Sequence, residues 1–193
     1  MKEQKHHRIL EAAEHLIARF GMRKTGVDEI ARAARVAKGT LYNYYGSKEG
    51  IVRELIREKI RRFDERLEGV FREFSDPVEK IRSVVHEHFR FLCANPGLTV
   101  LALDDSPEGE ALTGELDGRE KSLISRLVGE ARQADSIADA DPAQTADALL
   151  CMVRGLERAL RFRIPSGPFE SIRDDIDRAI GLLLAGLKKN RTI

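Results

Sequence analysis

The stretch Thr25–Lys48, TGVDEIARAARVAKGTLYNYYGSK, decides the fold of the chain. Three apolar residues in its first half share the three- and four-residue spacing of one helix face: Ile30, Ala31 and Ala34. A turn at Arg35-Val36 separates this helix from a second predicted helix over 38–44, in which Leu41 points inward. Two short helices joined by such a turn form the unit that places a recognition helix in the major groove of DNA.

The outward face of the second helix carries groups suited to a DNA duplex. Lysine side chains can neutralise phosphates, tyrosine hydroxyls can bond them, and asparagine or threonine can bond a base edge or a phosphate. Gly39 lacks a side chain, so the backbone can approach DNA closely at this point. Predicted DNA contacts from this face and the residues after it are Lys38, Gly39, Thr40, Tyr42, Asn43, Tyr44 and Lys48.

The segment IARAARVAKGTLYNYYGSKEGI, residues 30–51, resembles the signature of the TetR family of one-component transcriptional regulators. The resemblance begins at about Ile9 and is dense between Ile30 and Glu49. Arg35 stands where the family usually has a turn glycine, and Ala37 stands where it usually has a capping serine. Each departure is expected to cost about 1 kcal/mol of stability. Arg35 also adds a cation beside the DNA, so it is a predicted DNA contact. Thr25 is a further predicted DNA contact.

The charge distribution fits this resemblance. Residues 1–63 carry 15 Lys and Arg against 8 Asp and Glu, whereas the whole chain carries 33 against 32. A basic head on an acidic body suits a protein that touches a polyanion at one end. The alternative is a chance fluctuation on solvated helix faces.

Helical spacing recurs through the rest of the chain, and no segment alternates with the period of two that a strand requires. The polar segment 1–8 is expected to be frayed, with a helix starting at Ile9. Ser47 is expected to cap a long helix that reaches Phe74, and Pro77 starts the next one. Residues 104–118 are predicted to form a loop or a broken helix. The fold class is therefore all-α with about nine helices, divided into a three-helix DNA-binding head, 1–47, and a helical effector-binding and dimerisation body, 48–193.

The resemblance implies a small-molecule cavity inside the body. Its predicted lining is mostly apolar, which suits a largely hydrophobic effector with one polar or acidic end. The residues are His88, Phe89, Leu92, Leu127, Met152 and Leu156. The alternative is that they simply close the core, and for His88 the commoner case is a core histidine with its hydrogen bonds satisfied.

The last two predicted helices, 141–163 and 169–188, carry more apolar residues than a terminal pair normally needs. Simple core packing would explain them, but the resemblance implies a homodimer formed through a four-helix bundle. The predicted dimer residues are Val153, Leu160, Ile176, Ile180, Leu183, Leu184 and Leu187.

Features of an enzyme are missing from the sequence, which has no P-loop, GxGxxG, HExxH or GxSxG motif. Asp104 and Asp105 are adjacent and would point in different directions on a helix. Cys93 and Cys151 lack the spacing of metal ligands, so they are expected to be small buried residues in a reduced cytoplasm, with a thiol sensor as the alternative. No metal, cofactor or membrane span is expected.

Together with these patterns, the resemblance implies a homodimeric transcriptional repressor that leaves a palindromic operator when a small effector binds. The alternatives are an activator, or a DNA binder of the same fold without an effector. The operator sequence and the identity of the effector stay open at this point.

Overall fold

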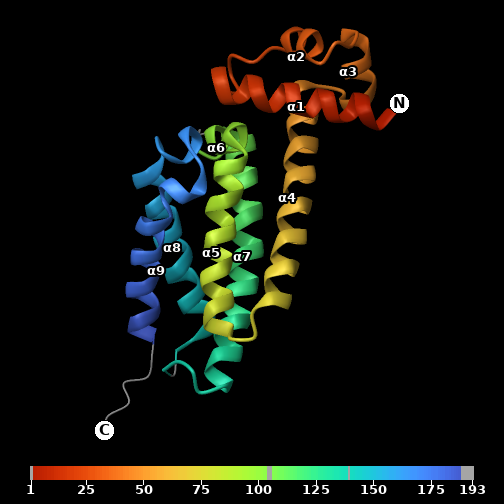
Figure 1. Cartoon of the computed structure of the whole chain (residues 1–193). Helices are drawn as coiled ribbons and strands as arrows, with labels where there is room; N and C mark the ends of the chain where they lie inside the picture. Colours follow the sequence, from red (N-terminus) through yellow and green to blue (C-terminus); the bar gives the residue numbers. More distant parts are fainter. Residues whose placement is uncertain (1, 104–105, 139, 188–193) are drawn as a thin grey trace.

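The computed structural model describes residues 2–103, 106–138 and 140–187, which form an all-helical chain (Figure 1). Within these residues lie nine α-helices and two short 3₁₀ turns, as the sequence predicted for the fold class. The elements are α1 (Lys2–Phe20), α2 (Val27–Ala33), α3 (Lys38–Tyr45), α4 (Lys48–Glu73), α5 (Pro77–Ala94), α6 (Pro96–Ala102), α7 (Pro107–Gln133), α8 (Pro142–Leu160), η1 (Ile164–Ser166), η2 (Phe169–Ser171) and α9 (Arg173–Leu187).

The head consists of α1, α2, α3 and the first turns of α4 (Figure 1). Its core brings together buried residues from all four helices: Ile9, Ala13, Ile17, Ile30, Leu41 and Ile51. The expectation that α1 starts at Ile9 was wrong, because the helix already begins at Lys2. The polar first turns have a partner in α4, where His6 Nε2 lies 3.6 Å from a carboxylate oxygen of Glu58. Residues 2–8 are therefore helical and contact α4, although their sequence lacks an apolar stripe.

Helix α4 is the connection between the head and the body (Figure 1). Ser47 caps it as predicted, because its hydroxyl accepts a hydrogen bond from Gly50 N at 3.1 Å. One face stays buried along both parts of the molecule, through Ile51, Val52, Leu55, Ile56, Ile60, Phe63 and Leu67. A movement of α4 in the body would therefore be transmitted along a continuous helix into the head.

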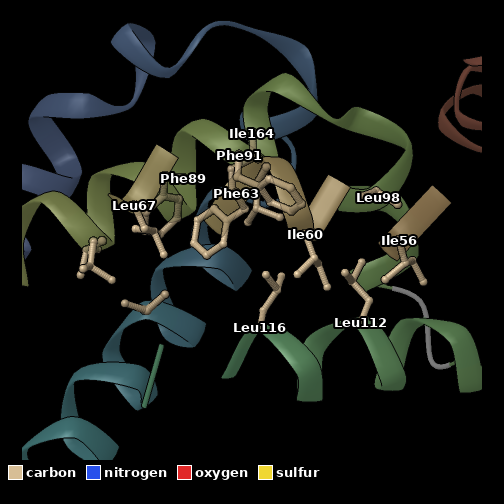
Figure 2. Packing of buried hydrophobic residues seen from close by; sticks show 14 of the residues in the cluster. Ile56, Ile60, Phe63, Leu67, Phe89, Phe91, Leu98, Leu112, Leu116 and Ile164 are labelled. Atoms are coloured by element: carbon tan, nitrogen blue, oxygen red, sulfur yellow. The ribbon is translucent and has the colours of Figure 1, made fainter. Parts of the chain in front are cut away.

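Helices α5 and α7 pack against α4, and α6 and α8 pack in turn against α7 to complete the core of the body. Figure 2 shows Leu112 and Leu116 of α7 pointing toward Ile56 and Ile60 of α4. Phe63 of α4 and Phe91 of α5 lie above them, with ring centroids 5.3 Å apart.

The predicted loop over 104–118 was wrong for its described part, because α7 begins at Pro107. Ser106 caps the helix by accepting a hydrogen bond from Gly109 N at 3.2 Å, and Pro107 occupies a first-turn position that it tolerates. Burial of Leu112 and Leu116 offsets the low helix propensity of the glycines in this segment. Asp104 and Asp105 lie outside the described residues.

Helix α6 fixes the body against the head. A Cβ atom added at Gly97 would lie 2.5 Å from the backbone carbonyl oxygen of Glu14 in α1, so only glycine permits this approach. The apolar side chains of Leu98 and Leu101 are fully buried behind this contact. Body and head are thus joined at two places, by continuous backbone through α4 and by packing of α6 on α1.

Candidate DNA-binding surface, effector region and dimer face

The helix-turn-helix is closed by backbone hydrogen bonds and one capping carboxylate. Gly26 N donates to Glu29 Oε2 at 2.9 Å, which ties down the start of α2. After α2, Val36 N donates to Ala31 O at 3.0 Å and closes the turn. Leu41 is buried against this turn, so the register of α3 is fixed and its other face points outward.

The outer face of α3 presents most of the predicted DNA contacts. Tyr42 and Tyr44 are 46% and 49% exposed, Lys38, Gly39 and Asn43 are exposed, and Thr40 is partly exposed. Lys38 Nζ lies 2.8 Å from a carboxylate oxygen of Asp28 in α2, and this hydrogen bond raises the pKa of the lysine. Both side chains remain largely exposed, so a DNA phosphate can replace Asp28 as the partner of Lys38.

Two predicted contacts are used inside the head instead. Thr25 is buried, and its hydroxyl donates to Gly21 O at 2.8 Å, while its contact with DNA stays a prediction. Lys48 Nζ donates to Met22 O at 3.0 Å and holds the loop after α1 against the start of α4. An ammonium group has further donors, but its first role here is to position the head.

Polar contacts through His6 link α3 to α1 and α4, and the sequence did not indicate them. The Tyr45 hydroxyl lies 2.9 Å from Nδ1 of His6, and Nε2 of the same ring faces Glu58 of α4. Burial, with Glu54 and Glu58 nearby, raises the pKa of Tyr45 to about 12. Tyr45 is partly buried against the core of the head, and His6 lies in the segment that the sequence predicted to be frayed. The end of the recognition helix is therefore held by groups from two other helices.

The predicted effector residues pack in or against the core of the body. Phe89, Leu92 and Leu127 are buried, and Met152 and Leu156 are partly buried. A cleft of about 430 Å³ lies elsewhere, between α4 and α7. It is lined by Asp64, Leu67, Glu68, Phe71, Arg119, Ser122, Leu123 and Arg126. The sequence alone could not place these two helices side by side.

His88 is the centre of a buried ionic network in the body. Its Nδ1 lies 2.6 Å from Glu120 of α7, and its Nε2 lies 2.5 Å from Glu157 of α8. Arg154 contacts both Glu157, at 2.5 Å, and Asp117. His88 lies on α5, and its partners lie on α7 and α8. The network therefore fixes the positions of these three helices relative to one another.

Their partners in this network hold His88 and Glu157 in their charged forms. Burial by itself lowers the pKa of His88, but the two facing carboxylates outweigh burial and raise it to about 10. Burial likewise raises the pKa of Glu157, and His88 and Arg154 outweigh it and lower the value to about 2. His88 thus has its polar atoms satisfied by protein groups, which is the core alternative that the sequence left open.

Helices α8 and α9 lie on the side of the bundle away from α4 (Figure 1). Five of the seven predicted dimer residues are buried within the protomer, and their place in a dimer interface stays a prediction: Val153, Leu160, Ile176, Ile180 and Leu184. Leu183 and Leu187 are partly buried. The periodic apolar residues of α9 face α5, and those of α8 face α7. Packing inside the protomer therefore explains the large number of apolar residues in these two helices.

A second, exposed stripe of small and apolar residues runs along the outside of α8 and α9. Its members are Ala148, Cys151, Gly155, Ala159, Phe162, Leu182, Ala185 and Gly186. Leu182 is 79% exposed and Phe162 is 74% exposed, which is unusual for such large apolar side chains. Cys151 is also exposed here, contrary to the expectation that both cysteines are buried, and Cys93 is only partly buried.

Residues 9–55 match the sequence model of the family described as bacterial regulatory proteins, tetR family. The head of the chain is therefore a DNA-binding domain of the TetR family. It is 36% identical over 100 residues to the fatty acid metabolism regulator protein of Bacillus subtilis strain 168. That alignment spans about half of each protein, 52% of this chain and 52% of the relative.

Solved structures of TetR-like regulators share the fold over nearly the whole chain. The TetR family transcriptional regulator PfmR from Thermus thermophilus is 26% identical, with a TM-score of 0.72 over 94% of this chain and 100% of that one. The transcriptional regulator FadR from Bacillus subtilis, solved in complex with stearoyl-CoA, is 23% identical, with a TM-score of 0.78 over 93% and 98% of the two chains. Both of these solved structures are named as transcriptional regulators. In the described part of the chain, no helix is long and apolar enough to cross a membrane.

In this TetR-family head, the two departures from the usual signature have visible consequences. Arg35 adopts a positive φ of 55°, the conformation that favours the glycine usual at this place. Ala37 occupies the N-cap of α3 and offers no side-chain hydrogen bond. Both positions are exposed, so each sacrifices about 1 kcal/mol of local stability beside the DNA-binding face.

Proposed function

We propose that the chain is a transcriptional repressor that binds a palindromic operator as a homodimer and releases it when a small molecule binds the body. The observation that carries this proposal is the outer face of α3, which presents Lys38, Tyr42, Asn43 and Tyr44 on a head rich in cations. Hydroxyl, amide and ammonium groups on an exposed recognition helix suit phosphates and base edges.

Selection from randomised duplexes with the wild-type protein would identify the operator. Lys38→Gln is then expected to weaken binding to operator and random DNA alike and to lower the salt slope by about one unit. Lys121→Gln is the matched control, because Lys121 is also an exposed lysine in a surface ion pair, with Asp147, but lies in the body. Fluorescence anisotropy at several salt concentrations measures both. Equal salt slopes for the two variants would contradict docking through α3.

The homodimer is proposed to form through α8 and α9, with the exposed stripe at its centre. Leu182→Glu would place a charge in the apolar interface, so the variant is expected to sediment as a monomer and to bind the operator far more weakly. Leu182 contributes little to the protomer core, so the variant should remain folded. Asp174→Asn, also exposed on α9, is the control. A wild-type protein that is already monomeric at micromolar concentration would overturn this part of the proposal.

The effector is proposed to be a largely hydrophobic molecule with an acidic end, bound in the cleft between α4 and α7. Its apolar wall is formed by Leu67, Phe71 and Leu123, and Arg119 and Arg126 lie in the same lining. A volume of about 430 Å³ falls in the range of small-molecule sites. Two similar proteins favour an effector with a fatty acyl chain: the fatty acid metabolism regulator protein of Bacillus subtilis, by its name, and the solved structure of FadR, by its bound stearoyl-CoA.

Because α4 forms one wall of this cleft, an occupant can have different affinities for the two orientations of the head. An effector must therefore weaken operator binding and, reciprocally, bind less tightly to the operator complex. Titration of the operator complex with palmitoyl-CoA and with free palmitate tests the class, and release by neither would contradict it. Phe71→Ala is expected to weaken effector binding, whereas Phe162→Ala, on the far side of the body, should not.

The division into a head of residues 1–47 and a body of residues 48–193 is part of the same proposal. An activator, or a DNA binder without an effector, is the second candidate function. A reporter gene placed behind the selected operator distinguishes them, since only a repressor raises expression when the chain is deleted.

A further inference from the structure

A second, basic cleft lies on the other side of α4, between this helix and the end of α5. It has a volume of about 200 Å³ and is lined by Lys59, Arg62, Phe63, Arg66, Phe91, Ala94 and Asn95. The three cations follow one another at helical spacing on one face of α4. The volume is below the usual range for a whole small-molecule ligand, so the cleft suits a compact charged group.

The ion pairs around this cleft leave positive charge in excess. Lys59 pairs with Glu14 at 2.7 Å, and Arg62 pairs with Glu58. Glu87 is shared by Arg90, at 2.6 Å, and Arg66, at 3.8 Å. Four cations thus share three carboxylates in these pairs. Arg66 is the least committed of the four, because its pair is long and its side chain is 57% exposed.

The floor of the cleft is apolar. Phe63 and Phe91 are buried, with their rings in contact. A charge held above this floor is less screened than one on an open surface, so its interaction with the cations is stronger. A guanidinium group in such a place can donate two parallel hydrogen bonds to the oxygens of one phosphate.

We propose that this cleft binds a phosphate or pyrophosphate group and that the bound anion draws Lys59 away from Glu14. Glu14 lies in α1, and its backbone is the surface on which Gly97 of α6 rests. The Lys59–Glu14 pair is therefore part of the junction between body and head. An anion that competes with Glu14 for Lys59 loosens this junction and favours a conformation with a different head orientation.

The anion can come from two sources that share this chemistry. One is the phosphorylated headgroup of an acyl-CoA, in which case the inference rests on the proposed function and the headgroup lies here instead of beside Arg119 and Arg126. The other is a free phosphate-bearing metabolite that binds independently of the effector. Competition between pyrophosphate and palmitoyl-CoA indicates the first source, and simultaneous binding of both indicates the second.

The test is calorimetric titration of the full chain with pyrophosphate and with coenzyme A, at constant ionic strength. Arg66→Gln is expected to weaken binding of both by about tenfold or more, because a charge-assisted contact is lost from a largely exposed side chain that the fold does not need. Arg61→Gln is the matched control: it removes an exposed arginine of α4 that pairs with Glu65 and does not line the cleft. Glu14→Gln is expected to strengthen binding, since it releases Lys59.

Absence of binding by wild type at millimolar pyrophosphate and coenzyme A, or equal affinities for Arg66→Gln and Arg61→Gln, would overturn the anion site. Failure of palmitoyl-CoA to release the operator, with Arg66-dependent pyrophosphate binding intact, would reject the acyl-CoA effector and leave the anion site standing. Tighter operator binding by wild type in the presence of pyrophosphate would refute the link to the Lys59–Glu14 junction.

Discussion

His88→Leu is expected to lower the free energy of unfolding by about 3–5 kcal/mol, because it removes one partner of a buried ionic network. Glu120 would lose the cation that faces it, while Glu157 would keep Arg154. Urea denaturation followed by circular dichroism measures the loss. His86→Leu is the matched control, since its partner Asp177 is partly exposed, and it is expected to cost about 1 kcal/mol.

A second variant separates the loss of charge pairing from a failure of packing. Replacing both His88 and Glu120 by leucine removes the unpaired carboxylate, so the double variant is expected to recover part of the lost stability. If His88→Leu alone is as stable as wild type, the network is not a determinant of stability and this interpretation fails.

The same network predicts how stability depends on pH. The folded-state pKa of His88, about 10, lies above its ordinary value of 6.5. Its contribution is therefore complete below about pH 6.5 and is lost as the pH rises through about 10. Glu157, lowered from 4.5 to about 2, contributes fully above about pH 4.5, and this contribution is lost as the pH falls toward 2.

The stability difference between wild type and His88→Leu is thus expected to be largest between about pH 4.5 and 6.5 and to shrink at pH 9.5. Denaturation curves at pH 5.5, 7.5 and 9.5 check this. A difference that grows toward pH 9.5 would show that His88 is not held in its protonated form by the two carboxylates.

Gly50→Ala is expected to lower operator affinity by about tenfold or more and to destabilise the head by about 1–3 kcal/mol. A Cβ atom at this position would lie 1.9 Å from the backbone carbonyl oxygen of Tyr45. Because a backbone atom cannot move alone, the end of α3 must separate from α4, and the recognition helix then tilts away from its docking geometry.

Gly69→Ala is the matched control on the same helix, since nothing lies within 4 Å of the Cβ position there. It is expected to stabilise α4 by about 0.5–1 kcal/mol and to leave operator affinity unchanged. Operator titration and thermal unfolding of both variants test the pair. Wild-type affinity in Gly50→Ala would mean that the position of α3 does not depend on this contact.

Local sequence patterns were reliable where the interactions that fix a structure lie close together in the chain. The helix-turn-helix, the Ser47 cap and the long α4 were all predicted, since spacing and capping act over only a few residues. The same local reasoning failed at α7, where prolines and glycines suggested a loop. Burial of Leu112 and Leu116 against α4 opposes those weak propensities, and that burial depends on distant residues.

The sequence by itself determined the family, the all-helical fold and a basic recognition helix, because each is written in neighbouring residues. Only the tertiary structure decided what each polar or apolar side chain meets. His88 finds its partners 32 and 69 residues away, and Lys48 is held by a carbonyl group 26 residues before it. The apolar residues of α8 and α9 have the same helical spacing whether they face the core of the protomer or the solvent. The packing of α8 and α9 on the rest of the bundle decides which stripe is buried inside the protomer and which, with Leu182, remains exposed.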